Sequence, residues 1–220
     1  MSDRWSRRAP LTGLVFVGLL VACFALSWNT PDDKASGAKV ISYFHAHRSQ
    51  LITANVLGAY AVIFWLFFTG SLRSFLRRAG ASEGLVTTAF GGAIVFGVGG
   101  AILSALSFTL ANEINRLDAQ GAHTLNLLST GVFFPIAAGQ AVFAISSAIA
   151  ILRTRALPAW LGWLAIVLGV VSITPVGFFA TFVLLLWSLI VSVLVYLRAE
   201  QPASAPAVTA PREPVSAAMG

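Results

Sequence analysis

Three histidines, with a few carboxylates, are the residues of this chain whose types could bind a metal ion. His45 and His47 are separated by one residue, and His123 lies on the same predicted side of the membrane, where Asp and Glu residues also occur. Imidazole nitrogens and carboxylate oxygens are ligands for zinc or copper. Positions i and i+2 of a helix point about 200° apart, so joint ligation by His45 and His47 requires a non-helical stretch. We keep His45, His47 and His123 as a minor metal-binding hypothesis and predict no cofactor.

The sequence lacks the signatures of known catalytic sites. It contains no HExxH, GxSxG or Walker glycine loop, and Cys23 is its single cysteine, which excludes an intramolecular disulfide. No Asp or Glu lies well inside an apolar run, as proton coupling would require. We therefore assign no catalytic residue. An intramembrane enzyme remains an alternative, because scattered residues can form such sites.

Uncharged polar side chains inside the apolar runs are the remaining candidates for binding chemistry. A glutamine near the middle of the membrane must find a hydrogen-bond partner, because hydrocarbon offers none. Structural hydrogen bonding between helices is one explanation, and contact with a ligand is the other. We predict an outward-facing pocket for a neutral or amphiphilic ligand, with amides orienting the ligand and a tyrosine forming an aromatic wall. Its predicted lining is Asn55, Tyr60, Asn126, Ser129 and Gln140.

The elements that must position these residues are membrane-spanning helices. The chain is 57% hydrophobic and 10% charged, with a mean hydropathy of +0.84, which is too apolar for a soluble core of this size. A spanning helix needs roughly 20 mostly apolar residues. We predict an all-α bundle of six transmembrane helices within residues 11–198. The predicted spans are residues 11–28, 51–68, 85–110, 125–152, 160–174 and 178–197.

The distribution of basic residues predicts the orientation of the bundle. Arginines gather around the first residues, the connectors after the second and fourth spans, and the end of the sixth span. Basic residues near span ends stay on the cytoplasmic side, so both termini are predicted to be cytoplasmic. Residues 1–10 form the N-terminal segment, and residues 199–220, rich in Ala, Pro and Ser, form a disordered tail. Attraction of these arginines to anionic lipid headgroups explains the basic pI, and we expect no nucleic-acid partner.

The first outer loop, residues 29–50, is predicted to contain a short amphipathic helix lying on the outer membrane surface as a cap. Val40, Tyr43, Phe44 and His47 recur at helical spacing in it. Farther along, Pro135 is expected to kink the fourth span.

A row of small residues in the third span predicts close helix packing. Small side chains let two helix backbones approach in lipid, where van der Waals packing drives association. Packing inside one bundle and homo-oligomerisation, or contact with a membrane partner, are both compatible with the row. Its members are Ala89, Ala93, Gly97, Ala101 and Ala105.

Three segments resemble a widespread family of uncharacterised six-span integral membrane proteins of high-GC bacteria. They are residues 35–48, which begin ASGAKVISYF, residues 72–77, LRSFLR, and residues 157–164, LPAWLGWL. The resemblance implies six spans and a bacterial plasma membrane, and it supplies no catalytic or binding residues.

These observations favour a non-enzymatic, multi-pass plasma-membrane protein that binds a small neutral or lipidic ligand or a membrane partner. A small-solute transporter or channel is the main alternative, and an outer-face metal-binding protein or intramembrane enzyme is another. A polar path that continues inward from Asn55 and Gln140 would favour transport. Convergence of the histidines with a carboxylate would favour a metal site.

Overall fold

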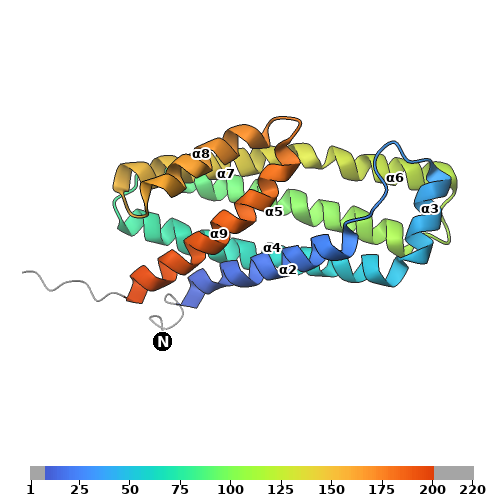
Figure 1. Cartoon of the computed structure of the whole chain (residues 1–220), viewed down its shortest axis with the longest axis horizontal. Helices are drawn as coiled ribbons and strands as arrows, with labels where there is room; N and C mark the ends of the chain where they lie inside the picture. Colours follow the sequence, from blue (N-terminus) through green and yellow to red (C-terminus); the bar gives the residue numbers. More distant parts are fainter. Residues whose placement is uncertain (1–7, 201–220) are drawn as a thin grey trace, which may run out of the picture.

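The structure, a computed structural model, describes residues 8–200, and helices are the only regular elements in that range. They form an elongated bundle (Figure 1). Five helical segments are apolar and long enough to cross a bilayer, so the prediction of an all-α membrane protein is confirmed. The elements are η1 (Ala9–Leu11), α2 (Thr12–Ser27), α3 (Gly37–Ala46), α4 (Arg48–Arg78), α5 (Glu83–Asn112), α6 (Ala119–Gly131), α7 (Phe133–Thr154), α8 (Ala159–Ser172) and α9 (Gly177–Glu200).

The number of long spans differs from the sequence prediction at the C-terminal hairpin. The expected span at residues 160–174 forms α8, which has only 14 residues. A helix of that length is about 21 Å long, shorter than the roughly 30 Å hydrocarbon layer. Figure 1 shows that the α8–α9 turn lies partway along the bundle. The structure therefore supports five long spans and one shorter apolar helix, not six full spans.

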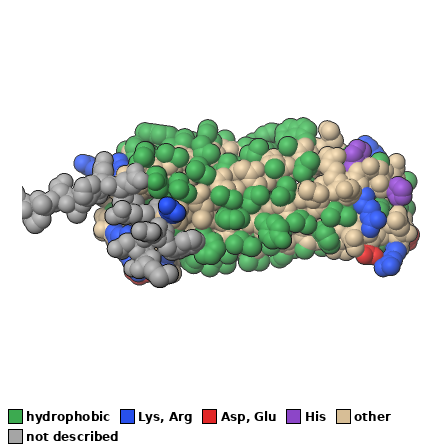
Figure 2. All heavy atoms as spheres, turned by 90° about the horizontal axis from the view of Figure 1, so that it is seen from below, with side chains coloured by type: hydrophobic (Ala, Val, Ile, Leu, Met, Phe, Trp, Pro, Cys, Tyr) green, Lys and Arg blue, Asp and Glu red, His purple; other side chains and the backbone are tan. Residues whose placement is uncertain are grey.

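Charged residues lie at the two ends of the bundle and leave an apolar middle on the face shown in Figure 2. One end contains the start of α2, the α4–α5 and α7–α8 connections, and the end of α9 (Figure 1). At this end Arg73 forms an ion pair with Glu83 across the α4–α5 connection. The connectors that the distribution of arginines predicts to share one side of the membrane thus lie at the same end of the bundle. We call it the arginine-rich end. The arginines of this end are Arg8, Arg73, Arg77, Arg78, Arg153, Arg155 and Arg198.

The opposite end carries a cap formed by α3 and α6. The Ser36 side chain accepts a hydrogen bond from a backbone N–H in the first turn of α3, which is a helix N-cap. Val40 and Phe44 are one turn apart and buried, in a cluster that includes Leu110 of α5 and Ala122 of α6. The helix expected in the first outer loop therefore forms and packs against the bundle itself.

Residues 28–36, here called the strap, connect α2 to α3 and are attached to α6 by two side chains. Asn126 Nδ2 donates a hydrogen bond to the Asp32 carbonyl at 2.9 Å. His123 Nδ1 lies 3.1 Å from the Ala35 carbonyl oxygen. The strap therefore reaches from α2 across to α6.

A break separates α6 from α7 near the proline that predicts a kink. The two helices form one segment of 36 residues, Ala119–Thr154, interrupted at Val132. Pro135 lies in the first turn of α7, where its missing N–H costs no hydrogen bond within that helix. The interruption thus precedes the proline by one turn.

The row of small residues on α5 packs inside the bundle over its first half. The three positions nearest the α4–α5 connection are buried: Ala89, Ala93 and Gly97. Ala101 is half-buried and Ala105 is exposed. Trp65 of α4 donates its indole N–H to the Ala93 carbonyl at 2.8 Å, so this part of the row faces α4. Packing within one molecule accounts for the buried half.

Candidate functional site

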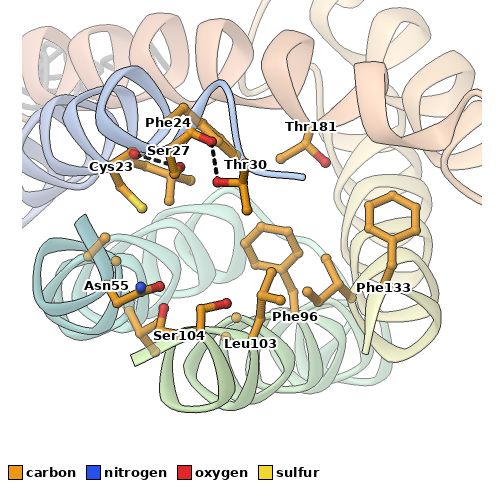
Figure 3. A pocket seen from close by; sticks show the side chains of 18 of the residues that line it. Cys23, Phe24, Ser27, Thr30, Asn55, Phe96, Leu103, Ser104, Phe133 and Thr181 are labelled. Carbon is orange, nitrogen blue, oxygen red and sulfur yellow. Dashed lines mark hydrogen bonds between the residues drawn. The ribbon is translucent and has the colours of Figure 1, made fainter. Parts of the chain in front are cut away.

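A cavity of about 440 Å³ lies between α2, α4 and α5, in the part of the bundle nearer the α3–α6 cap. Figure 3 shows Asn55 from α4, Ser104 from α5 and Thr181 from α9 pointing into the same space. Its volume falls within the range of about 300–1,000 Å³ that is usual for small-molecule pockets. The site is therefore large enough to hold a ligand, and it draws its walls from helices that are far apart in the chain.

Aromatic rings close the end of the cavity that is farther from the α3–α6 cap, which we call its inner end or floor. The centroid of the Trp65 ring lies 4.9 Å from that of Phe16 and 5.0 Å from that of Phe96. Behind these rings, Phe143 of α7 packs edge-on against Trp65 at 4.9 Å. Trp65 is fully buried, and its hydrogen bond to the Ala93 carbonyl fixes the orientation of the indole. The floor is thus rigid and apolar.

Three uncharged polar groups in the wall have hydrogen-bonding capacity left for a ligand. Asn55 Nδ2 donates to the Leu51 carbonyl at 2.8 Å, which leaves its side-chain oxygen as an acceptor. The hydroxyls of Ser104 and Ser107 have no hydrogen-bond partner among the described residues. No charged side chain is among the described residues that line the cavity. The lining therefore suits a neutral molecule with a few polar atoms.

Gly58 brings α4 close to α2 and α5 beside these polar groups. A Cβ atom placed on Gly58 would lie 2.8 Å from Ser104 Oγ and 3.3 Å from Cys23 Sγ. The Cys23 thiol points toward the cavity in Figure 3. Any side chain at position 58 would crowd this part of the wall.

The hydroxyls at the end of α2 are already used by the protein. Ser27 Oγ donates to the Cys23 carbonyl at 2.8 Å, and Thr30 Oγ1 donates to the Ser27 carbonyl at 2.7 Å (Figure 3). The Ser27 carbonyl also accepts the backbone N–H of Thr30 at 3.1 Å, so both groups of Thr30 close a turn at the end of α2. Ser27 and Thr30 therefore shape the cavity wall and position the first residues of the strap.

The accessible side of the cavity has an aromatic rim. Trp28 is 67% exposed and Phe178 is 42% exposed, and both contribute to the lining. Phe133 of α7 faces Phe178 of α9 with ring centroids 6.2 Å apart. A ligand that enters here passes apolar rings before it reaches the polar groups.

The predicted site residues are placed differently from one another. Asn55 lines the cavity, whereas Tyr60, which is 55% exposed, does not. Asn126 binds the strap, and Ser129 Oγ donates to a carbonyl of its own helix, four residues earlier. Gln140 is buried behind the wall, where its Oε1 accepts a hydrogen bond from Thr181 Oγ1 at 3.1 Å. The structure thus places Asn55 in the cavity wall. Gln140 is connected to the cavity only through Thr181, which lines the wall.

The residues that the predicted set omits are mainly aromatic. Phe16, Trp65 and Phe96 come from three different helices and have no common sequence spacing. The depth of Trp65 within its span indicates packing between helices or contact with lipid, but neither reading distinguishes a cavity wall from a core position. Ser104 and Ser107 belong to an excess of hydroxyls in the outer halves of the predicted spans. That excess is the one signal in the sequence that points toward them.

The three histidines do not converge. His47 Nδ1 lies 3.0 Å from the Tyr43 carbonyl oxygen within the same turn, and its ring stacks on the Tyr43 ring with centroids 4.4 Å apart. His123 instead contacts the strap. Among the described residues, no group of three or more His, Cys, Asp and Glu is arranged to hold a metal ion. The geometry adds nothing in favour of the metal hypothesis for His45, His47 and His123.

Comparisons with known proteins found no match to a protein-family model, to a curated protein or to a solved structure. The resemblance to a bacterial membrane family therefore stays a hypothesis.

Proposed function

We propose that this protein is an integral membrane protein that binds one small, neutral, amphiphilic molecule in the cavity between α2, α4 and α5. The observation that carries the proposal is the combination of a wall without charged residues and polar groups that the protein leaves unused. Asn55 Oδ1 and the hydroxyls of Ser104 and Ser107 supply an acceptor and two hydroxyls. A few such groups in an apolar pocket orient a ligand and give specificity.

The order of residues along the cavity sets the orientation of the ligand. The floor of Phe16, Trp65 and Phe96 accepts a hydrocarbon chain or ring, because burial of apolar surface contributes about 25 cal/mol per Å². The polar end of the ligand lies beside Asn55 and Ser104. A neutral lipid with a short chain and a hydroxylated head has this distribution of polarity.

In the membrane, we place the arginine-rich end on the cytoplasmic side, following the distribution of basic residues. The hydrocarbon layer then aligns with α2 and α9, and the shorter α8 runs back through part of its depth. Helices α4 and α5 have 31 and 30 residues. At about 45 Å each they exceed the layer, so their outer ends and the α3–α6 cap protrude. The cavity then lies at the level of the outer leaflet. A bacterial plasma membrane is proposed on the resemblance alone.

Binding is favoured over transport because aromatic rings occupy the inner end of the cavity. Passage toward the arginine-rich end would require Trp65 and Phe96 to separate, and Trp65 is held by its bond to Ala93. Assembly with a partner remains compatible with the exposed end of the α5 row at Ala105. Assembly makes no use of the unpaired polar groups of the wall.

The test uses a photoactivatable short-chain monoacylglycerol and the full-length protein reconstituted in liposomes. Gly100 lines the cavity, and the nearest atom to a Cβ placed there is Val62 Cγ2 at 3.9 Å, so a leucine at this position fills the cavity without a backbone clash. We expect saturable labelling of lining residues, which unlabelled monoacylglycerol prevents and Gly100→Leu abolishes. Gly91→Leu is the matched control, because Gly91 is exposed on the same helix and has open space beside it.

The proposal fails if labelling is confined to exposed lipid-facing residues or is equal in the Gly100→Leu and Gly91→Leu proteins. It also fails if an anionic lipid competes as well as the neutral one, because a wall without charged side chains does not compensate the cost of burying an anion. Thermal unfolding of both variants separates loss of binding from loss of the fold.

A further inference from the structure

A second cavity, of about 290 Å³, lies at the arginine-rich end between α4, η1 and α9. Its α4 wall repeats at helical spacing, so these residues form one face of that helix. The opposite wall is made by Ala9 and Pro10 of η1 and by Val195 of α9. We refer to this cavity as the inner groove. Its α4 residues are Leu66, Phe67, Gly70, Ser71, Ser74, Phe75 and Arg78.

The polarity of the inner groove changes in one direction along α4. Leu66 and Phe67 are exposed apolar side chains at one end. Small and hydroxyl residues follow, then Phe75, and the groove finishes at Arg78. Leu66 and Arg78 are separated by about 18 Å along the helix, close to the roughly 15 Å half-thickness of the hydrocarbon layer. Hydrocarbon, ester and phosphate succeed one another over the same depth in a phospholipid.

Arg78 is available to an anion. Its guanidinium is exposed and has no carboxylate partner among residues 8–198. The carboxylate at this end within that range belongs to Glu83, and it is engaged by Arg73. Ser71 likewise has no hydrogen-bond partner within the described residues. A phosphate beside Arg78 would therefore meet uncompensated positive charge.

Gly70 leaves space that no described part of the protein fills. A Cβ atom placed on Gly70 would meet no protein atom within 4 Å. A glycine in the interior of a helix costs about 0.5–1 kcal/mol relative to alanine, so its presence is unfavourable for α4 alone. The open space beside Gly70 is the middle of the inner groove, where the glycerol and first carbons of a lipid chain would lie.

We propose that the inner groove binds one anionic phospholipid of the adjacent leaflet, with its phosphate at Arg78, its ester region at Ser71, and one acyl chain along Gly70 and Leu66. The inner groove is independent of the cavity between α2, α4 and α5, here called the outer cavity. The two lie toward opposite ends of the bundle and share no lining residue. Basic pockets between transmembrane helices are known to select anionic headgroups.

The experiment measures phospholipids retained by the purified full-length protein, by native mass spectrometry after exchange in mixed phosphatidylglycerol and phosphatidylcholine with identical chains. We expect retention of one phosphatidylglycerol in preference to phosphatidylcholine. Arg78→Gln should weaken it about fivefold, as expected for one arginine near an anionic surface. Gly70→Leu should abolish it, because the side chain fills the groove.

Two control variants separate the groove from general properties of the bundle. Arg153→Gln removes a cation at the same end but outside the groove, and Gly18→Leu adds the same side chain at an exposed helical glycine with open space beside it. Both should retain the lipid. Equal loss in the Arg78→Gln and Arg153→Gln proteins, retention in a folded Gly70→Leu protein, or equal retention of both phospholipids would overturn the proposal. Displacement of the lipid by inorganic phosphate alone would also overturn it, because the site would then bind a free anion.

Discussion

Gly92 of α5 and Gly139 of α7 face each other so closely that neither position has room for a side chain. A Cβ atom placed on Gly92 would lie 2.8 Å from the Gly139 carbonyl oxygen, and one placed on Gly139 would lie 2.8 Å from the Gly92 carbonyl oxygen. The contact is thus reciprocal and involves backbone on both sides. It lets α7 approach α5 closely, with the Phe143 ring filling the space beside Trp65 at the cavity floor.

Gly92→Ala should destabilise the bundle by about 1–3 kcal/mol, because the added methyl overlaps backbone atoms that cannot move independently. Thermal unfolding in detergent measures the loss. Gly91→Ala is the control, because Gly91 is exposed and has open space beside it. Its melting temperature should not fall, since alanine is the better helix former. Equal melting temperatures for the two variants would show that the α5–α7 contact is looser than the structure indicates.

Thr181→Val should destabilise the protein by about 1–3 kcal/mol, because it leaves the buried Gln140 amide without its partner. Gln140→Leu should cost less, since it removes the whole amide, including the Nε2 group that has no partner among the described residues. The double variant should resemble Gln140→Leu alone. A double-mutant cycle of unfolding free energies measures this coupling, and strictly additive effects would contradict it.

Trp187→Phe should lower the unfolding free energy while leaving the outer cavity intact. The Trp187 indole donates to the Leu161 carbonyl at 3.0 Å and ties α9 to α8, and Trp187 does not line the cavity. Loss of this bond should lower the unfolding free energy by about 0.5–1.5 kcal/mol. Trp65→Phe is the comparison, because it removes the corresponding α4–α5 bond and also changes the cavity floor. Monoacylglycerol labelling should decrease in Trp65→Phe and persist in Trp187→Phe.

Asn126→Ala should loosen the strap without unfolding the bundle. The variant removes one of the two side chains that attach residues 28–36 to α6. Amide hydrogen exchange in the strap should become about two- to tenfold faster, which corresponds to the loss of about 0.5–1.5 kcal/mol. Ser129→Ala is the control on the same helix, because Ser129 bonds only to its own helix. Unchanged exchange in Asn126→Ala would show that the strap is held by other contacts.

Cysteine labelling in intact cells tests the orientation. In a Cys23→Ala background, a membrane-impermeant maleimide should modify Gln120→Cys, at the start of α6, and should not modify Ser82→Cys, at the start of α5. Both positions are exposed and lie at opposite ends of the bundle. Modification of Ser82→Cys from outside would reverse the proposed orientation.

Several features of the fold follow from the sequence because they depend on composition and local spacing. The apolar runs predict membrane helices, since lipid requires every backbone group to be bonded within its own helix. The spacing of Val40 and Phe44 predicts a helix in the first outer loop, and both side chains are buried in it. The helix predicted at residues 160–174 forms as α8, and the prediction is wrong only in counting this 14-residue helix as a full span.

The candidate site depends on contacts between segments that are distant in the chain, and sequence spacing does not encode them. Asn55 and Tyr60 point about 140° apart on α4, so the spacing alone shows that they do not share a face. How α4 rotates against α2 and α5 decides that Asn55 faces the cavity and Tyr60 is exposed. Gln140 has the buried partner that its polarity demands, yet only the packing of α9 against α7 identifies that partner as Thr181. The sequence by itself determined the solvent for each helix, lipid or water. The tertiary structure decided which polar groups pair with one another and which remain free for a ligand, because pairing requires distances that only the packed bundle defines.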